Sequence, residues 1–174
     1  RRAEQIGSTA GSWASAKALA HVARAKSLAE DGKISEAAID FADAETLGGS
    51  KASLSPVRSI LLSAYLKQAK EALDQTNVLA VRSACTSAAT YGASASELNR
   101  LRARAYILEG SQKEKSGDAA GALASLEEAM KLNRSLALES ERATLHVKLG
   151  MQSVARGDYA SAAKSLNAAI AIDK

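Results

Sequence analysis

Proline, cysteine and aromatic residues are scarce in this 174-residue chain, which has one proline, one cysteine, one tryptophan and 3% aromatics. A single cysteine cannot form a disulfide within the chain. The near-absence of proline, together with abundant strong helix formers, excludes a strand-rich fold and predicts an all-α one. Long apolar runs are also missing, since no stretch approaches the roughly 20 apolar residues that a transmembrane helix needs.

A strong excess of one charge is missing too. The net charge is +4 and the sequence pI is about 9.2, with basic and acidic residues interleaved. In the densest basic run, Arg100 and Arg104 share one helical face while Arg102 points away. Because no aromatic residues accompany this run to stack on bases, it favours an ordinary solvated surface over a nucleic-acid interface.

Alanine, by contrast, is abundant, with 39 alanines in a chain that is 47% hydrophobic. Alanine lets helices pack at short distances but buries little area in each contact. This composition predicts thin, stacked helical hairpins rather than one spherical core.

One sequence pattern occurs four times, each time around an anchor residue in a predicted turn. The anchors, at periods of 44, 41 and 40 residues, are Gly32, Thr76, Gly117 and Gly157. Mostly small or apolar residues recur five, nine, twelve and fifteen positions after each anchor: Ala37, Val81, Ala122 and Ala162; Phe41, Cys85, Leu126 and Leu166; Ala44, Ala88, Ala129 and Ala169; Leu47, Tyr91, Leu132 and Ile172. One such unit cannot bury its apolar face alone, so the repetition predicts stacked units with an extended surface.

The pattern also holds before each anchor. Seven positions before it the residue is always small, as in Ala25, Ala69, Gly110 and Gly150. Eleven positions before it the residue always carries a flat ring, as in His21, Tyr65, Tyr106 and His146. Small residues at one position let two helix backbones approach closely, and a ring one turn earlier fills the wider part of the gap.

These features resemble the tetratricopeptide repeat (TPR) superfamily, and the last unit, from Ala143 to Lys174, matches it best. That unit combines Leu149–Gly150, a Gly-Asp-Tyr turn at Gly157, and the spaced residues Ala162, Leu166 and Ala169. The resemblance implies a right-handed TPR-like α-solenoid of four antiparallel helix hairpins. The family repeats about every 34 residues, so these repeats of about 40 residues imply elongated first helices; other α-solenoids of that period are the alternative.

Helix start and stop signals divide the chain into an approach segment, 1–11, and a repeat domain, 12–174. Within the domain, the hairpins are expected at about 12–49, 54–93, 95–134 and 135–173. The chain opens without a methionine, and we expect it to be a domain of a larger bacterial protein, either cytoplasmic or periplasmic.

Three residues are expected to cap helices, and one proline is expected to start one. Ser94, Asp118 and Asp158 each precede a predicted helix and have the side chains that N-caps require. Pro56 is expected in the first turn of its helix, where proline is favoured.

Few residues suggest chemistry. His21 and His146 occupy ring positions three repeats apart, which favours packing over shared metal binding. Cys85 stands at a position held elsewhere by Phe or Leu, which favours an inert buried thiol over a nucleophile. No phosphate-binding glycine loop or zinc-ligand spacing occurs. We therefore expect no enzyme activity, metal, cofactor or small-molecule substrate.

A row of apolar residues ten positions before each anchor is the predicted partner site: Val22, Leu66, Ile107 and Val147. Around the row lie Lys26, Lys67, Lys70, Arg104, Lys148 and Met151. In TPR proteins, first-helix residues facing the concave groove contact an extended peptide or partner helix. The resemblance therefore implies a scaffold or adaptor domain whose protein partner offers an apolar, somewhat acidic peptide or helix. The alternative is that the row is inter-helix core.

Two other function classes remain open from the sequence. Leu166 and Ile170 lie on a face that would normally meet a further helix, which suggests self-assembly into homo-oligomers through the C-terminal hairpin. RNA binding by a basic helical repeat is the third class, although the interleaved charges disfavour it.

Overall fold

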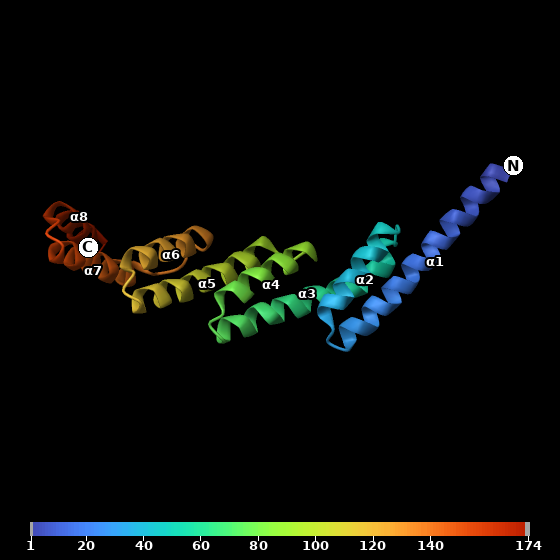
Figure 1. Ribbon diagram of the computed structural model, residues 1–174, viewed down its shortest axis with the longest axis horizontal. Helices are drawn as coiled ribbons and strands as arrows, with labels where there is room; N and C mark the ends of the chain where they lie inside the picture. Colours follow the sequence, from blue (N-terminus) through green and yellow to red (C-terminus); the bar gives the residue numbers. More distant parts are fainter. Residues whose placement is uncertain (1, 173–174) are drawn as a thin grey trace. The chain divides into compact units, whose positions relative to one another are not determined.

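A computed structural model describes residues 2–172 of the chain, and the side chains of residues 11–172. The described residues form eight α-helices and no strand (Figure 1). The helices are α1 (Arg2–Glu30), α2 (Ile34–Thr46), α3 (Lys51–Asp74), α4 (Val78–Thr90), α5 (Ala95–Lys115), α6 (Ala119–Leu132), α7 (Glu139–Ala155) and α8 (Tyr159–Ile172). The predicted all-α fold class is confirmed.

The helices belong to two compact units, which are described separately. Unit 1 comprises the described residues up to Gln68 together with Thr86–Ala93, and unit 2 comprises Ala69–Cys85 and the described residues from Ser94 onwards. Helices α1 and α2 therefore belong to unit 1, helices α5 to α8 belong to unit 2, and α3 and α4 contribute to both.

The anchor residues lie in the turns between paired helices. Gly32, Gly117 and Gly157 have left-handed φ angles of 78°, 86° and 76°. A Cβ atom added to any of these three would meet nothing within 4 Å, so the turn requires glycine for its backbone angle and not for space. Thr76 has a φ of 55° at the equivalent position, which is strained for a β-branched residue.

Three hairpins result from these turns and the packing that follows them. Helices α1 and α2 pack together in unit 1, and α5 packs with α6 and α7 with α8 in unit 2 (Figure 1). Helix α7 also packs against α6, so it links two consecutive hairpins of unit 2.

The core of unit 1 joins alanines to a small aromatic cluster. Ala25 of α1 lies in one buried group with Phe41 and Ala44 of α2. The Tyr91 ring stacks on Tyr65 with centroids 5.6 Å apart and meets the Phe41 ring edge-on at 5.4 Å. Each such ring pair contributes about 0.5–1.5 kcal/mol beyond the burial of its area.

Unit 2 has a second buried group made of alanine and leucine. It includes Ala103 of α5, Leu126 and Ala129 of α6, Leu145 of α7, and Leu138, which directly precedes α7. Leu138 and Leu145 therefore complete a core that the α5–α6 hairpin begins.

Close helix contacts occur where the small-residue series predicted them. A Cβ atom added to Gly110 would lie 3.3 Å from both the Ala122 carbonyl oxygen and Leu126 Cδ2. At Gly150 the added atom would lie 2.7 Å from Leu166 Cγ. Ala25 and Ala69, at the same position of the first two repeats, have no exposed surface. The predicted close approach is confirmed.

Two glutamines of unit 2 each bond to the turn of the preceding repeat. The Gln112 side chain donates a hydrogen bond to the Thr76 carbonyl oxygen at 3.1 Å, and Gln152 donates to that of Gly117 at 3.0 Å. Each glutamine stands five positions before its own anchor and reaches the anchor of the preceding repeat. The repeat therefore carries a specific polar contact as well as an apolar one.

Several helix boundaries differ from the sequence-based ones. The backbone is helical from Arg2, so most of the predicted approach segment belongs to α1, where alanine, glutamate and glutamine outweigh the roughly 1 kcal/mol that each glycine costs. Helix α3 begins at Lys51 because Ser50 Oγ accepts a hydrogen bond from the Ser53 amide at 3.2 Å, which places Pro56 inside the helix.

Helix α7 begins at Glu139, four residues after the expected start. Asn133 Oδ1 accepts hydrogen bonds from the Ser135 amide at 3.2 Å and from the Ser135 hydroxyl at 2.7 Å. This local side-chain turn competes with helix formation.

The three expected N-caps are confirmed. Ser94 accepts a hydrogen bond from the Glu97 amide, Asp118 from that of Gly121, and Asp158 from that of Ser161. None of the described helices combines the length and apolar character that crossing a bilayer requires.

Candidate partner-binding surface

The position nine residues after each anchor distinguishes the last hairpin from the others. At this position Phe41, Cys85 and Leu126 are at most 5% exposed, whereas Leu166 is 37% exposed. Leu126 is covered because α7 packs over it, with Leu138 in the same buried group. Among the described residues, no helix covers α7 and α8 in the same way.

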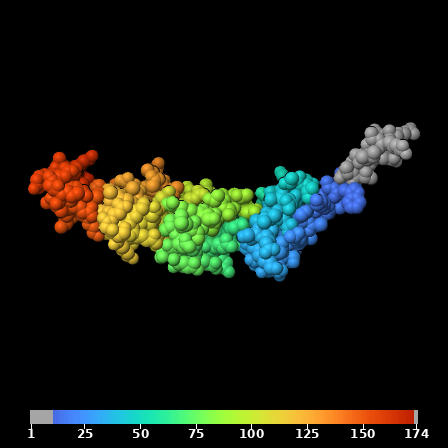
Figure 2. Space-filling model, viewed as in Figure 1, coloured from blue at the N-terminus to red at the C-terminus, as the bar shows by residue number. Residues whose placement is uncertain are grey.

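The uncovered side of the α7–α8 hairpin carries a cluster of apolar residues that we call the terminal face: Ala143, Val147, Leu166, Ala169 and Ile170. Val147 is 40% exposed and Ile170 is 59% exposed. A hollow of about 310 Å³ lies on this face, lined by four of its members together with the hydroxyl-bearing Ser140 and Thr144. Figure 2 shows the hairpin in red as a continuous packed block.

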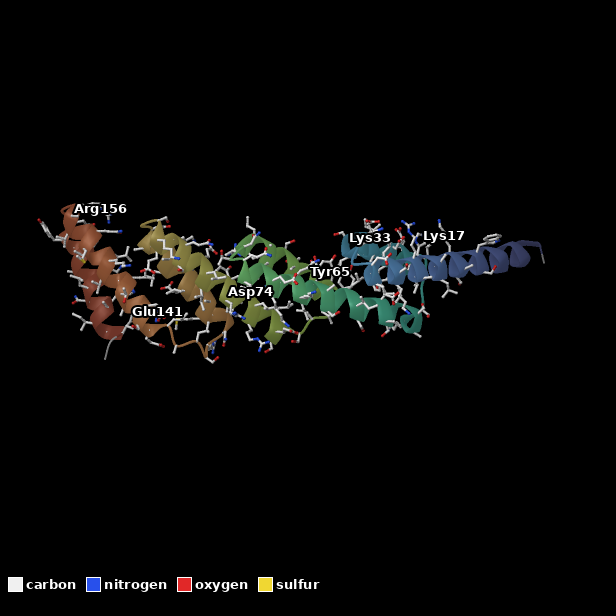
Figure 3. All side chains as sticks on the ribbon, turned by 90° about the horizontal axis from the view of Figure 1, so that it is seen from below. Lys17, Lys33, Tyr65, Asp74, Glu141 and Arg156 are labelled. Carbon is white, nitrogen blue, oxygen red and sulfur yellow. The ribbon has the colours of Figure 1, made fainter. Side chains whose placement is uncertain are left out.

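Further apolar side chains extend this surface along α7. Val147, Met151 and Val154 follow one another at helical spacing and are all exposed. Glu141 and Arg156, labelled in Figure 3, mark the two ends of this helix. Because contiguous exposed apolar area on a protein commonly marks an interaction site, α7 and α8 offer the strongest candidate surface in unit 2.

The sequence-predicted row divides between the two units. Val22 and Leu66 lie in unit 1, and Ile107 and Val147 lie in unit 2. Val22 and Ile107 are half-buried against the cores of their units, and Leu66 is also half-buried. Val147 is exposed and belongs to the terminal face. Each residue keeps some surface, and Val147 keeps the most.

Part of the basic rim around this row is paired with acidic side chains. Lys26 Nζ lies 3.8 Å from Glu30 Oε1, and Lys148 pairs with Glu114. The other three cations are exposed: Lys67, Lys70 and Arg104. Exposed Met151 lies one turn after Val147 on α7. Rim charges of this kind steer a partner, whereas buried apolar anchors supply most of the affinity.

A buried carboxylate in unit 1 was missed by sequence reasoning. Asp40 of α2 is 3% exposed, and its Oδ1 accepts a hydrogen bond from His21 Nδ1 of α1 at 2.9 Å. Arg24 Nε lies 3.0 Å from Asp40 Oδ2, close enough for an ion pair although it makes no hydrogen bond. The only available signal was that the other repeats have alanine or serine where Asp40 stands.

This cluster has the composition of a metal site, but its buried carboxylate already has a cationic partner. Ligand atoms of His21, Asp40 and Asp43 lie within 4.8 Å of one another, a spacing that a metal ion could use. However, the Arg24 guanidinium beside Asp40 already neutralises the buried carboxylate and opposes a second cation. The geometry therefore fits a structural ion pair between α1 and α2.

The other two potentially reactive side chains, Cys85 and His146, show no features of a catalytic site. Cys85 is fully buried, as predicted, and burial raises the pKa of its thiol although Arg102 acts in the opposite direction. His146 is half-buried, and its Nδ1 has no hydrogen-bond partner. A buried thiol of raised pKa is a poor nucleophile.

Comparisons of the chain with protein-family models, with curated proteins and with solved structures gave no match.

Proposed function

We propose that this chain is a non-catalytic, TPR-like helical-repeat domain that binds an amphipathic helix of a protein partner on the terminal face. In this proposal the four hairpins are antiparallel and form a right-handed α-solenoid. Support comes from features that recur at fixed distances from the anchors: the left-handed turns, the close contacts at Gly110 and Gly150, and the bonds made by Gln112 and Gln152.

One comparison within unit 2 carries the proposal. The α5–α6 hairpin is covered by α7 and the residue before it, so that Leu145 and Leu138 join the shared core. The α7–α8 hairpin presents the same positions, yet Leu166 and Ile170 are exposed. An amphipathic helix with leucines at the spacing of Leu138 and Leu145 is therefore the ligand that this face fits.

The site's composition supports binding rather than catalysis. Its lining combines apolar side chains with the hydroxyls of Ser140 and Thr144 and includes no charged side chain. None of the side chains that line the hollow carries a carboxylate, an imidazole, an amine or a thiol.

A defined peptide tests the proposal. A labelled synthetic peptide covering Asn133–Arg156, which contains α7, should bind the chain saturably in a fluorescence-anisotropy titration. A control peptide with Leu138, Leu145 and Leu149 replaced by serine should not bind. Failure of the first peptide, or equal binding by the control, would contradict the proposal.

Two matched substitutions locate the site. Ile170→Glu should weaken binding at least tenfold, or about 1.4 kcal/mol, because it places a charge in an apolar contact. Ile39→Glu should leave binding unchanged. Ile39 is exposed, and its position seven residues after the anchor is exposed in all four repeats, so no hairpin uses it for packing. Equal effects of the two substitutions would place the site elsewhere.

A further inference from the structure

At a second repeated position, nineteen residues before each anchor, the first helix differs from the others in the exposure of its side chain. Val57, Leu98 and Leu138 stand there in the last three repeats and are at most 7% exposed. Trp13 stands there in the first repeat and is 76% exposed. Trp13, the largest apolar side chain at this position, is therefore the one that no other described helix buries.

Buried members of this position have a common role. Val57 lies in the unit 1 core with Phe41, which stands nine residues after the preceding anchor. Leu138 lies in the unit 2 core with Leu126, which stands at the corresponding position. In both units, the residue nineteen positions before an anchor thus packs in one core with the second helix of the preceding hairpin.

At each of these two repeat positions, nineteen residues before and nine residues after an anchor, one side chain is exposed. Trp13 is the exposed residue at minus nineteen, and Leu166 is the exposed residue at plus nine. On α1, Ala16 and Ala20 follow Trp13 at helical spacing and are exposed, while Ala25 faces the core shared with α2. Helix α2 therefore leaves the Trp13 face of α1 open.

We propose that the terminal face binds helix α1 of a second copy of this chain, with Trp13 entering the hollow beside Val147 and Ile170. This inference rests on the proposed function and names the partner helix. The docked α1 would occupy on α8 the place that α7 occupies on α6. A tryptophan there buries roughly 150–250 Å², and tryptophan is one of the residues enriched among those that supply most of the binding energy of an interface.

The contact is heterologous, since each copy uses α1 for one partner and α7–α8 for the other. Such contacts either close into a ring or continue into an open filament. Because one helix on one hairpin is a small interface, and small interfaces are typical of weak complexes, we expect association to depend on concentration.

The single tryptophan provides a direct readout. As the concentration of the chain increases, its mean mass should rise above 18.0 kDa, and the emission of Trp13, the sole tryptophan, should shift to shorter wavelength. A constant mass would overturn the proposal, as would a rise in mass with unchanged emission. A blue-shifted emission that does not depend on concentration would place the contact within one chain and would also overturn it.

Two variants test the head-to-tail arrangement. Trp13→Glu alters the docking helix and leaves the terminal face unaltered, whereas Ile170→Glu alters the terminal face and leaves α1 unaltered. Both side chains are exposed, so circular dichroism should show folded proteins. Each variant alone should be monomeric, whereas their mixture should form dimers of one copy of each. Because Trp13→Glu has no tryptophan, the emission shift in the mixture reports only the docked Trp13 of the other copy. Ile39→Glu should self-associate as the unaltered chain does.

The outcomes separate this inference from the proposed function. Peptide binding at the terminal face without self-association would overturn the second-copy inference and leave the proposed function standing. Association of Ile170→Glu with itself, or a mixture that stays monomeric, would also contradict the head-to-tail contact. If the unaltered chain neither binds the peptide nor self-associates, both proposals are overturned.

Discussion

Gly150 packs so closely against Leu166 that a Cβ atom at residue 150 would lie 2.7 Å from Leu166 Cγ. We predict that Gly150→Leu destabilises the α7–α8 hairpin by about 1–3 kcal/mol, because overpacking forces neighbouring side chains and backbone apart. Thermal unfolding followed by circular dichroism measures the effect. An unchanged midpoint would show that the close contact is not needed.

Gly110 supplies a matched control for this prediction. A Cβ atom there would lie 3.3 Å from its nearest neighbours, a tight contact but not an overlap. Gly110→Ala should therefore be nearly neutral, since a gain of roughly 0.8–1 kcal/mol in helix propensity offsets a small packing cost. Gly150→Ala should be less stable than Gly110→Ala, and the reverse order would contradict the geometry.

Replacing Thr76 with glycine, the residue at the other three anchors, should increase the stability of the chain. We expect Thr76→Gly to stabilise the chain by up to about 1 kcal/mol, because a left-handed conformation costs a non-glycine residue roughly 1–2 kcal/mol and glycine's greater unfolded-state freedom cancels part of the gain. The reverse change, Gly117→Thr, should destabilise. Urea unfolding of both variants tests the pair, and a less stable Thr76→Gly protein would refute the strain.

The His21–Asp40 hydrogen bond should matter more than an exposed ion pair on the same helix. His21→Ala leaves the buried Asp40 carboxylate without its hydrogen bond and should cost on the order of 1–3 kcal/mol. Lys26→Ala, which removes the exposed pair with Glu30, should cost about 0–1 kcal/mol. Equal unfolding midpoints in urea would argue against a structural role for the buried pair.

Cys85 should be protected from thiol reagents in the folded chain. Burial raises its pKa above the ordinary 9.0, so the folded protein retains the thiol proton at a pH where the unfolded chain has lost it. Its contribution to stability is therefore fully present below that ordinary value and is lost as pH rises through the folded-state pKa. Alkylation should follow the rate of unfolding. Rapid stoichiometric labelling under native conditions would contradict the burial.

The sequence predicted those features that depend on residues close together in the chain. The helical class follows from composition, and the turns at Gly32, Gly117 and Gly157 follow from glycine at helix ends. The contact at Gly150 was predictable because the small residue recurs at one position of every repeat. Asp118 and Asp158 were recognisable as caps for the same local reason.

Other features depend on which helix lies opposite, and sequence patterns do not contain that information. Leu126 and Leu166 are the same residue at the same repeat position, yet only the first is buried, because α7 covers it. The approach of His21 to Asp40 depends on how α1 and α2 are rotated about their axes. The late start of α7 depends on the turn at Asn133, where a side chain competes with the helix.

Residue-level mapping of peptide binding tests the central claim most directly. The isotope-labelled chain would be titrated with the Asn133–Arg156 peptide, and amide chemical shifts would be followed by nuclear magnetic resonance. The proposed function predicts saturable shifts at Ala143, Val147, Ala169 and Ile170, with no change at Ile39. Shifts confined to other helices, or no shifts at saturating peptide, would contradict the claim that the terminal face binds a partner helix.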